Sequence, residues 1–166
     1  MAAPPRMKVG RLAFFALTAA LLGAAGWQWR SDREQAPGTL LGIDPAGVQR
    51  IDLAWHGGVT EHYARRDGHW QAVDGTSLPV DEGRLADLAA TAAAPVQSWR
   101  ALAEFDPARI GLAPAPVVLT LDGQALSFGE IAVTGPLRYV RAGDRVALVP
   151  VRFTPRPAKA NTTRAP

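Results

Sequence analysis

Residues 117–129 read VVLTLDGQALSFG and contain the strongest β-hairpin signal in the chain. Apolar residues alternate on both sides of Asp122-Gly123, a pair that two-residue hairpin turns prefer because both positions need positive φ. Such a turn places Leu119 opposite Leu126, so the apolar side chains of both strands fall on one face. This segment therefore predicts an antiparallel hairpin that buries one face.

Five other runs have the two-residue period of half-buried strands and are bounded by glycine-containing turns. They are residues 48–55, 59–66, 69–73, 137–141 and 145–149. A three-residue loop at 56–58 pairs Ile51 with Tyr63 and keeps one face apolar, whereas a two-residue loop mixes apolar and polar side chains. We expect the three-residue loop. The last two runs place Tyr139 opposite Leu148.

Residues 80–94 predict the main helix. Asp81 can cap its first turn, Pro95 ends it, and apolar residues recur on one face at the helical period. These residues are Leu85, Leu88, Ala89 and Ala92. A single capped turn is expected at 105–112, ending at Gly111. Because uncovered hairpins are only marginally stable, we expect an α+β fold in which antiparallel β-hairpins pack against this one helix.

Residues 12–29 read LAFFALTAALLGAAGWQW and carry no charge. As a helix this segment spans about 27 Å, close to the roughly 30 Å hydrocarbon core of a bilayer. Its flanks are those of an anchor, with Arg6, Lys8 and Arg11 before it and Trp27, Trp29 and Arg30 at its end. Since positive charge stays in the cytoplasm, we expect a bacterial inner-membrane protein with a cytoplasmic N-terminus and a periplasmic C-terminal domain. A cleaved signal peptide is the alternative, because residues 23–26 are small.

The 166 residues include no cysteine, which excludes disulfides, thiolate metal sites and a cysteine nucleophile. The net charge is +3, but residues 12–150 contain 11 basic and 15 acidic side chains, so the basic excess lies at the two ends. An exported, mildly acidic domain argues against nucleic acid as a partner. We expect a cytoplasmic basic N-terminus (1–11), a transmembrane signal anchor (12–29), a linker (30–41), an exported α+β domain (42–150) and a disordered basic tail (151–166).

The residue pattern indicates no catalytic, cofactor or metal site. His56, His62 and His69 are close in sequence, but the expected register separates His62 from His69 by about 13 Å, too far for a shared zinc ion. The chain contains neither a Gly-x-Ser-x-Gly nucleophile motif nor a phosphate-binding glycine loop. We therefore expect a protein that is not an enzyme and needs no cofactor.

Three residues that follow the helix, up to the start of the capped turn, are candidates for an interaction surface. Trp99 and Arg100 have no role in the expected hairpins, and Phe105 follows them closely. We predict Trp99, Arg100 and Phe105 as exposed contacts for a partner. The alternative is that the aromatic residues belong to the core, where small domains commonly place them.

Several short motifs occur in an order that resembles a bacterial family called domain of unknown function 4340. They are residues 48–53 (VQRIDL), 67–70 (DGHW), 79–81 (PVD), 110–112 (IGL) with Pro114, 127–130 (SFGE) and 139–141 (YVR). The resemblance covers about residues 40–150. It implies a membrane-anchored exported domain of a family in which some members are near or fused to auxiliary components of gliding-type ABC transporters, and it supplies no catalytic residues.

Together, the anchor and the resemblance predict an inner-membrane-anchored periplasmic interaction module, an accessory subunit of a transporter or envelope assembly. Its expected partners are the lipid bilayer and an envelope or transporter protein. The alternative function is a periplasmic domain that binds a small ligand or glycan in a groove beside Trp99 and Phe105.

Overall fold

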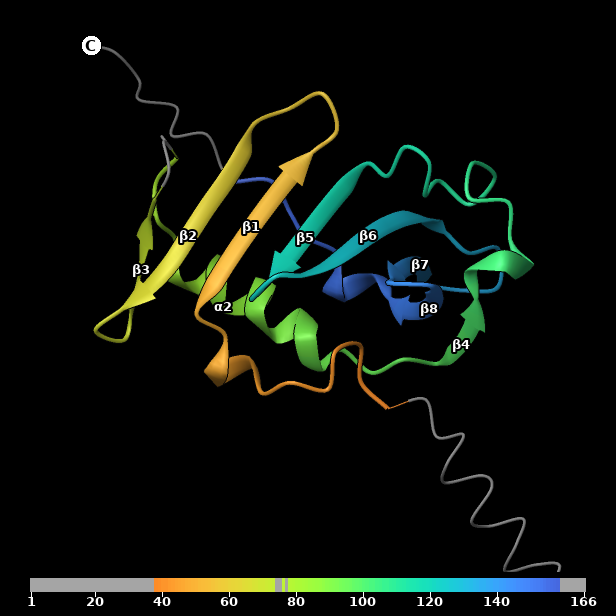
Figure 1. The fold of residues 1–166 in the computed structure, drawn as a ribbon, viewed down its shortest axis with the longest axis horizontal. Helices are drawn as coiled ribbons and strands as arrows, with labels where there is room; N and C mark the ends of the chain where they lie inside the picture. The colour runs from red at the N-terminus through yellow and green to blue at the C-terminus, as the bar shows by residue number, and fades with distance from the viewer. Residues whose placement is uncertain (1–37, 74–75, 77, 159–166) are drawn as a thin grey trace, which may run out of the picture. The chain divides into compact units, whose positions relative to one another are not determined.

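The predicted hairpins join into one antiparallel sheet (Figure 1). The computed structural model describes residues 38–73, 76 and 78–158. In this part of the chain the strand order is β3-β2-β1-β5-β6-β7-β8-β4. The strands are β1 (Arg50–Trp55), β2 (Thr60–Arg66), β3 (His69–Ala72), β4 (Ser98–Ala101), β5 (Val117–Leu121), β6 (Gln124–Ile131), β7 (Leu137–Ala142) and β8 (Arg145–Pro150). The described residues place one short α-helix beside this sheet, so their arrangement is α+β.

The strand registers are those expected from the turns. Ile51 pairs with Tyr63 across the three-residue loop between β1 and β2. Leu119 pairs with Leu126 across the Asp122-Gly123 turn, and β7 pairs with β8 in the predicted register. Turn geometry and apolar alternation agree in these hairpins, which is why the sequence specifies their register.

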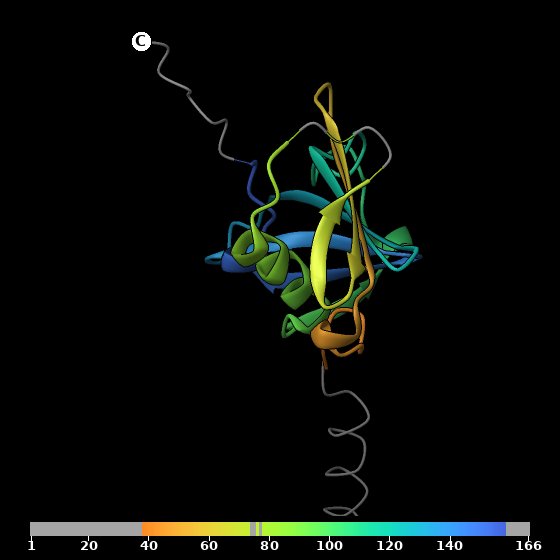
Figure 2. The same ribbon diagram turned by 90° about the vertical axis from the view of Figure 1, so that its left-hand side faces the viewer.

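The α-helix α2 (Glu82–Ala90) packs beside β1 and β3, and Figures 1 and 2 show it against one face of the curved sheet. The Asp81 carboxylate accepts a hydrogen bond from the Arg84 backbone N–H at 3.0 Å, the predicted N-cap. The α-helix is shorter than predicted, because its last turn tightens into a 3-10 helix, η2 (Thr91–Ala93), ahead of Pro95. The predicted apolar stripe is buried: Leu85, Leu88, Ala89 and Ala92.

The core lies between α2 and the face of the sheet that it covers. Apart from Leu85 of α2, the largest fully buried apolar side chains come from four neighbouring strands: Ile51, Leu53, Tyr63, Leu119, Leu121, Leu126 and Phe128. We call this the core face of the sheet and the opposite one the outer face.

Two domain boundaries differ from the prediction. The linker expected at 30–41 ends earlier, because Leu40 is only 4% exposed and its N–H donates to the Ala94 carbonyl at 3.0 Å. The tail expected to be disordered from residue 151 begins instead with a 3-10 helix, η4 (Val151–Phe153), whose phenylalanine packs against the core. In both segments the burial of apolar surface offsets the entropy lost on ordering.

The predicted anchor, residues 12–29, lies outside the described residues. The same holds for Arg6, Lys8, Arg11, Trp27, Trp29 and Arg30, and for the tail from residue 159 onward. Within the ranges that the structure describes, no helix is long and apolar enough to cross a membrane. The anchor therefore stays a prediction from the sequence.

Candidate functional site

Trp99 and Arg100 belong to β4, an edge strand of the sheet that pairs with β8. Because side chains alternate along a strand, these two residues lie on opposite faces. Trp99 pairs with Ala147 on the core face and packs partly against the core, with the Arg145 guanidinium 4.1 Å from the centre of its ring. Trp99 and Phe105 are both half-buried, so of the three residues predicted as exposed contacts only Arg100 is exposed.

Arg100 and Phe105 come together on the outer face. Phe105 meets Tyr139 edge to face, with ring centroids 5.8 Å apart and an interplanar angle of 65°. Both rings and Arg100 line a hollow of about 270 Å³, which we call the Phe105 hollow. Its other lining residues are Ser98, Val146 and Leu148. Arg100 Nε also lies 3.0 Å from Glu104 Oε2, but an ion pair this exposed holds the side chain only weakly.

The segment between β4 and β5 carries Phe105 across the outer face. It begins with a 3-10 helix, η3 (Leu102–Glu104), and the turn that follows ends at Gly111 with φ +69°, as predicted. Gly129 of β6 gives the segment room, since a Cβ there would collide with the Ile110 carbonyl oxygen. Direct backbone contact between this segment and β6 therefore holds Phe105 over the sheet.

Trp99 lines a separate hollow of about 450 Å³ on the core side. The other residues around it are Leu40, Leu41, Gln124, Ala125, Ala142, Gly143 and Arg145. The single groove expected beside Trp99 and Phe105 is therefore divided between the two faces of β4. Only Arg100 and Phe105 of the three predicted contacts share one site.

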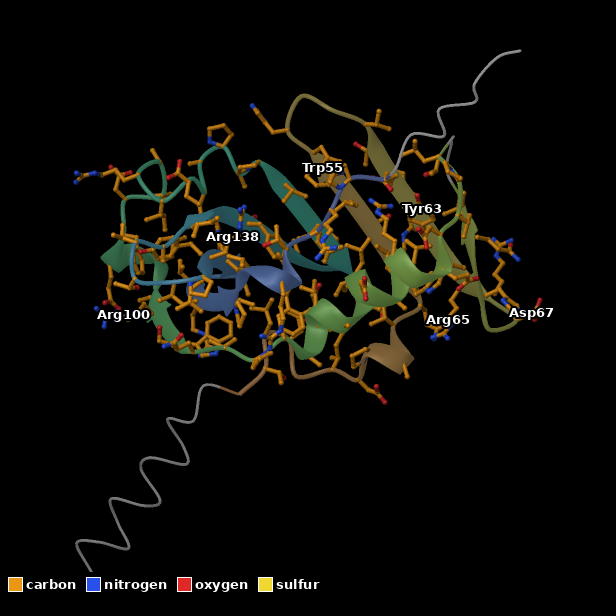
Figure 3. All side chains as sticks on the ribbon, turned by 180° about the vertical axis from the view of Figure 1, so that it is seen from behind. Trp55, Tyr63, Arg65, Asp67, Arg100 and Arg138 are labelled. Carbon is orange, nitrogen blue, oxygen red and sulfur yellow. The ribbon has the colours of Figure 1, made fainter. Side chains whose placement is uncertain are left out.

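A buried ion pair that the sequence analysis missed joins α2 to β2. Arg84 Nη1 and Nη2 donate to Glu61 Oε2 and Oε1 at 2.7 and 2.9 Å, and Glu61 is 1% exposed. The Tyr63 hydroxyl and the Trp55 indole donate to the same carboxylate at 2.9 and 3.3 Å; Figure 3 shows Tyr63 near α2 and Trp55 nearer the loop between β1 and β2. Arg84 Nε donates to the Arg156 carbonyl at 3.0 Å, which also ties the C-terminal segment to the helix.

The ion pair shifts the protonation equilibria of its members. Burial opposes the charge of Glu61, but the hydrogen bonds from Arg84, Tyr63 and Trp55, together with the charge of Arg84, outweigh it and lower the pKa of the carboxyl below its usual 4.5. Burial, and then the hydrogen bond and charge of Glu61, raise the pKa of Tyr63 to about 12. Since Glu61 is buried and accepts from donors on β1, β2 and α2, this cluster fastens the helix to the sheet.

The three histidines lie in separate surroundings. His62 Nδ1 is 2.7 Å from Asp52 Oδ1 on the outer face, whereas His69 Nδ1 is 3.6 Å from Glu82 Oε1. His56 is exposed in the loop after β1. Across residues 38–73, 76 and 78–158, no three His, Cys, Asp or Glu side chains are grouped so that they could hold a metal ion.

A third hollow, of about 310 Å³, lies between α2 and the C-terminal segment. Its charged lining residues are Asp81, Arg84, Asp87, Arg152 and Arg156. Because Arg84 is neutralised by Glu61, the remaining charges balance and indicate no particular ligand.

Comparisons of the chain with protein-family models, curated proteins and solved structures found no match. The resemblance to the domain of unknown function 4340 family therefore stays a prediction, and a function has to be argued from the site itself.

Proposed function

We propose that this chain is an inner-membrane-anchored periplasmic interaction module that binds an envelope or transporter protein. The observation that carries the proposal is the Phe105 hollow on the outer face. It combines two aromatic rings with an arginine whose side chain is 62% exposed. Aromatic residues and arginine are the types most enriched at the energetic centres of protein interfaces.

The accessory role follows from the expected anchor. A chain tethered by residues 12–29 diffuses in two dimensions and keeps its exported domain close to membrane partners, which raises their effective concentration. The resemblance to anchored domains associated with ABC transporters points to the same class of partner. A non-enzymatic role is consistent with the use of the ionisable cluster of Glu61, Tyr63 and Arg84 as a structural contact.

Copurification tests the proposal. The full-length chain is crosslinked in membranes, purified in detergent and compared with the variants Phe105→Ala and Arg100→Ala. We expect the wild type to recover one discrete envelope or transporter protein and either variant to lose about tenfold or more of it, because truncated hot-spot residues weaken binding on that scale. Arg66→Ala, at an exposed arginine of β2, is the matched control and should keep the partner. Undiminished recovery in both variants, or no partner at all, contradicts the proposal.

A second candidate function is the binding of a glycan or small ligand in the same hollow. It is favoured by the Ser98 and Tyr139 hydroxyls, which make no hydrogen bond to other described residues. Hydroxyl groups beside aromatic rings suit a sugar ring, although the hollow of about 270 Å³ is small. Saturable thermal stabilisation of the full chain by an envelope sugar, lost in Phe105→Ala, would favour this function; no stabilisation argues against it.

A further inference from the structure

The first described residues are fastened to the segment that leads from α2 into β4. The backbone N–H groups of Leu40 and Leu41 donate to the carbonyls of Ala94 and Ala92 at 3.0 and 2.9 Å. Figure 1 shows the two segments side by side. The ordered domain therefore begins at Gly38, so residues 30–37 alone separate it from the predicted anchor.

This short connection limits how far the edge of the domain at residues 38–41 can lie from the bilayer. The eight residues from 30 to 37 span at most about 29 Å when fully extended. The polar headgroup layer on each side of a bilayer adds roughly 5–8 Å to the hydrocarbon core. With the anchor in the membrane, the surface around Leu40 and Leu41 stays within reach of phospholipid headgroups.

The hollow of about 450 Å³ beside Trp99 adjoins this edge, because Leu40 and Leu41 belong to its lining. We call it the Trp99 hollow. Its lining is mainly apolar and includes one charged side chain, Arg145. The hollow can be entered from outside, since four of its lining residues are exposed: Gln124, Ala125, Gly143 and Arg145.

Arg145 supplies a positive charge that the described residues do not neutralise. Its guanidinium lies 4.1 Å from the centre of the Trp99 ring and makes no ion pair or hydrogen bond to another described residue. Asp144, the neighbouring residue in the turn, is exposed and makes no ion pair with it. Arg141 reaches the same turn, where its Nε donates to the Gly143 carbonyl at 2.8 Å. The turn between β7 and β8 thus carries a net positive charge beside an apolar hollow.

We infer that the Trp99 hollow binds an anionic phospholipid, with the headgroup phosphate on Arg145 and the glycerol and first acyl carbons against the apolar lining. Charge complementarity supports this occupant, because a phosphodiester carries one negative charge and the lining carries one positive charge. An arginine beside a half-buried tryptophan is also typical of surfaces that meet the headgroup region. That a bilayer lies next to the domain rests on the proposed function; the apolar hollow with its single cation does not.

Fluorescence quenching in lipid nanodiscs tests the inference. Because the chain has no cysteine, Gln124→Cys at the hollow and Gln71→Cys on β3 can each carry one bimane label in the full-length chain. The discs contain phosphatidylcholine with or without phosphatidylglycerol, and a trace of lipid whose headgroup carries a nitroxide quencher. We expect stronger quenching at position 124 than at position 71. Phosphatidylglycerol should increase the quenching at position 124 by about fivefold, the contribution of one arginine near an anionic surface.

Variants separate the phosphate contact from general attraction to the bilayer. Arg145→Gln should abolish the increase caused by phosphatidylglycerol, and Arg145→Lys should keep most of it, because it keeps the charge. Arg66→Gln, at an exposed arginine of β2, is the matched control and should change nothing. With the unlabelled full chain, a photoreactive phosphatidylglycerol should modify residues 142–145 in preference to residues 69–72.

The inference is overturned by equal quenching at the two positions, by quenching that does not depend on phosphatidylglycerol, or by an unchanged dependence in Arg145→Gln. Capture of a protein or of a second copy of this chain, instead of lipid, by a photoreactive residue at position 124 also overturns it. If the chain does not stay in the discs, the anchor fails and the proposed function fails with it. If the chain stays but the two positions are quenched equally, only this inference falls, and the Phe105 variants still decide the proposed function.

Discussion

Replacing Arg84 with methionine is the sharpest test of the contact between α2 and the sheet. The substitution keeps most of the side-chain length but removes the cation that faces the Glu61 carboxylate, which is 1% exposed. The carboxylate then keeps only the hydrogen bonds from Tyr63 and Trp55. Removing one partner of a buried ion pair costs about 3–5 kcal/mol, and each kcal/mol corresponds to roughly 3 °C in a domain of this size. We therefore expect Tm to fall by about 10–15 °C.

Thermal unfolding of the full chain at pH 7, followed by near-ultraviolet circular dichroism, measures this loss. Arg66→Met, at an exposed arginine of β2, should change stability by no more than about 0.5 kcal/mol. The double variant Glu61→Leu with Arg84→Met should recover most of the lost stability, because no buried charge remains to be desolvated. The reasoning is refuted if Arg84→Met costs less than about 1 kcal/mol or if the double variant is no more stable than the single one.

Three further predictions follow from the fold and the expected topology. The pKa of Tyr63 is raised from 10.0 to about 12, so the stabilisation from its neutral hydroxyl is complete below pH 10. As pH rises to 12, the free energy of unfolding should fall by up to about 2.7 kcal/mol. Urea titrations should show a smaller fall over this pH window in Tyr63→Phe. Gly129→Ala should be less stable by roughly 1–3 kcal/mol in urea, because its Cβ would meet a backbone carbonyl, whereas Gly47→Ala, with open space around it, should not. Since the chain has no cysteine, Gln71→Cys should react with a membrane-impermeant maleimide outside spheroplasts and Ala3→Cys should not; the reverse pattern contradicts the proposed topology.

The hairpins could be predicted because their information is local. The Asp122-Gly123 turn and the alternation around it fix one register, and the structure has that register. β4 could not be predicted in this way, since Ser98–Ala101 is short and lacks apolar alternation. β4 pairs with β8, which lies far along the chain. The segment is therefore a strand because of this long-range pairing and not because of its own sequence pattern.

The candidate functional site was predicted less completely than the hairpins, because it too depends on contacts between segments that are far apart in the sequence. Arg100 and Phe105 were proposed together, but the face on which they meet depends on how the segment after β4 crosses β6. Glu61 is a polar residue in sequence, and only the register with β1 places it on the core face opposite Leu53. The register expected for the first hairpin already implied this position, so a carboxylate there was a signal of a buried partner. Which arginine pairs with the Glu61 carboxylate depends on how α2 packs on the sheet, and sequence spacing alone does not determine that packing.

Site-specific photocrosslinking in intact cells tests the central claim most directly. A photoreactive phenylalanine analogue replaces Phe105 in the full-length chain, and the same analogue at Gln71, an exposed position on β3, is the comparison. The account predicts that position 105 captures one discrete envelope or transporter protein, that position 71 does not, and that adding Arg100→Ala reduces the capture from position 105. Equal capture from both positions, or no protein captured from position 105, would contradict it.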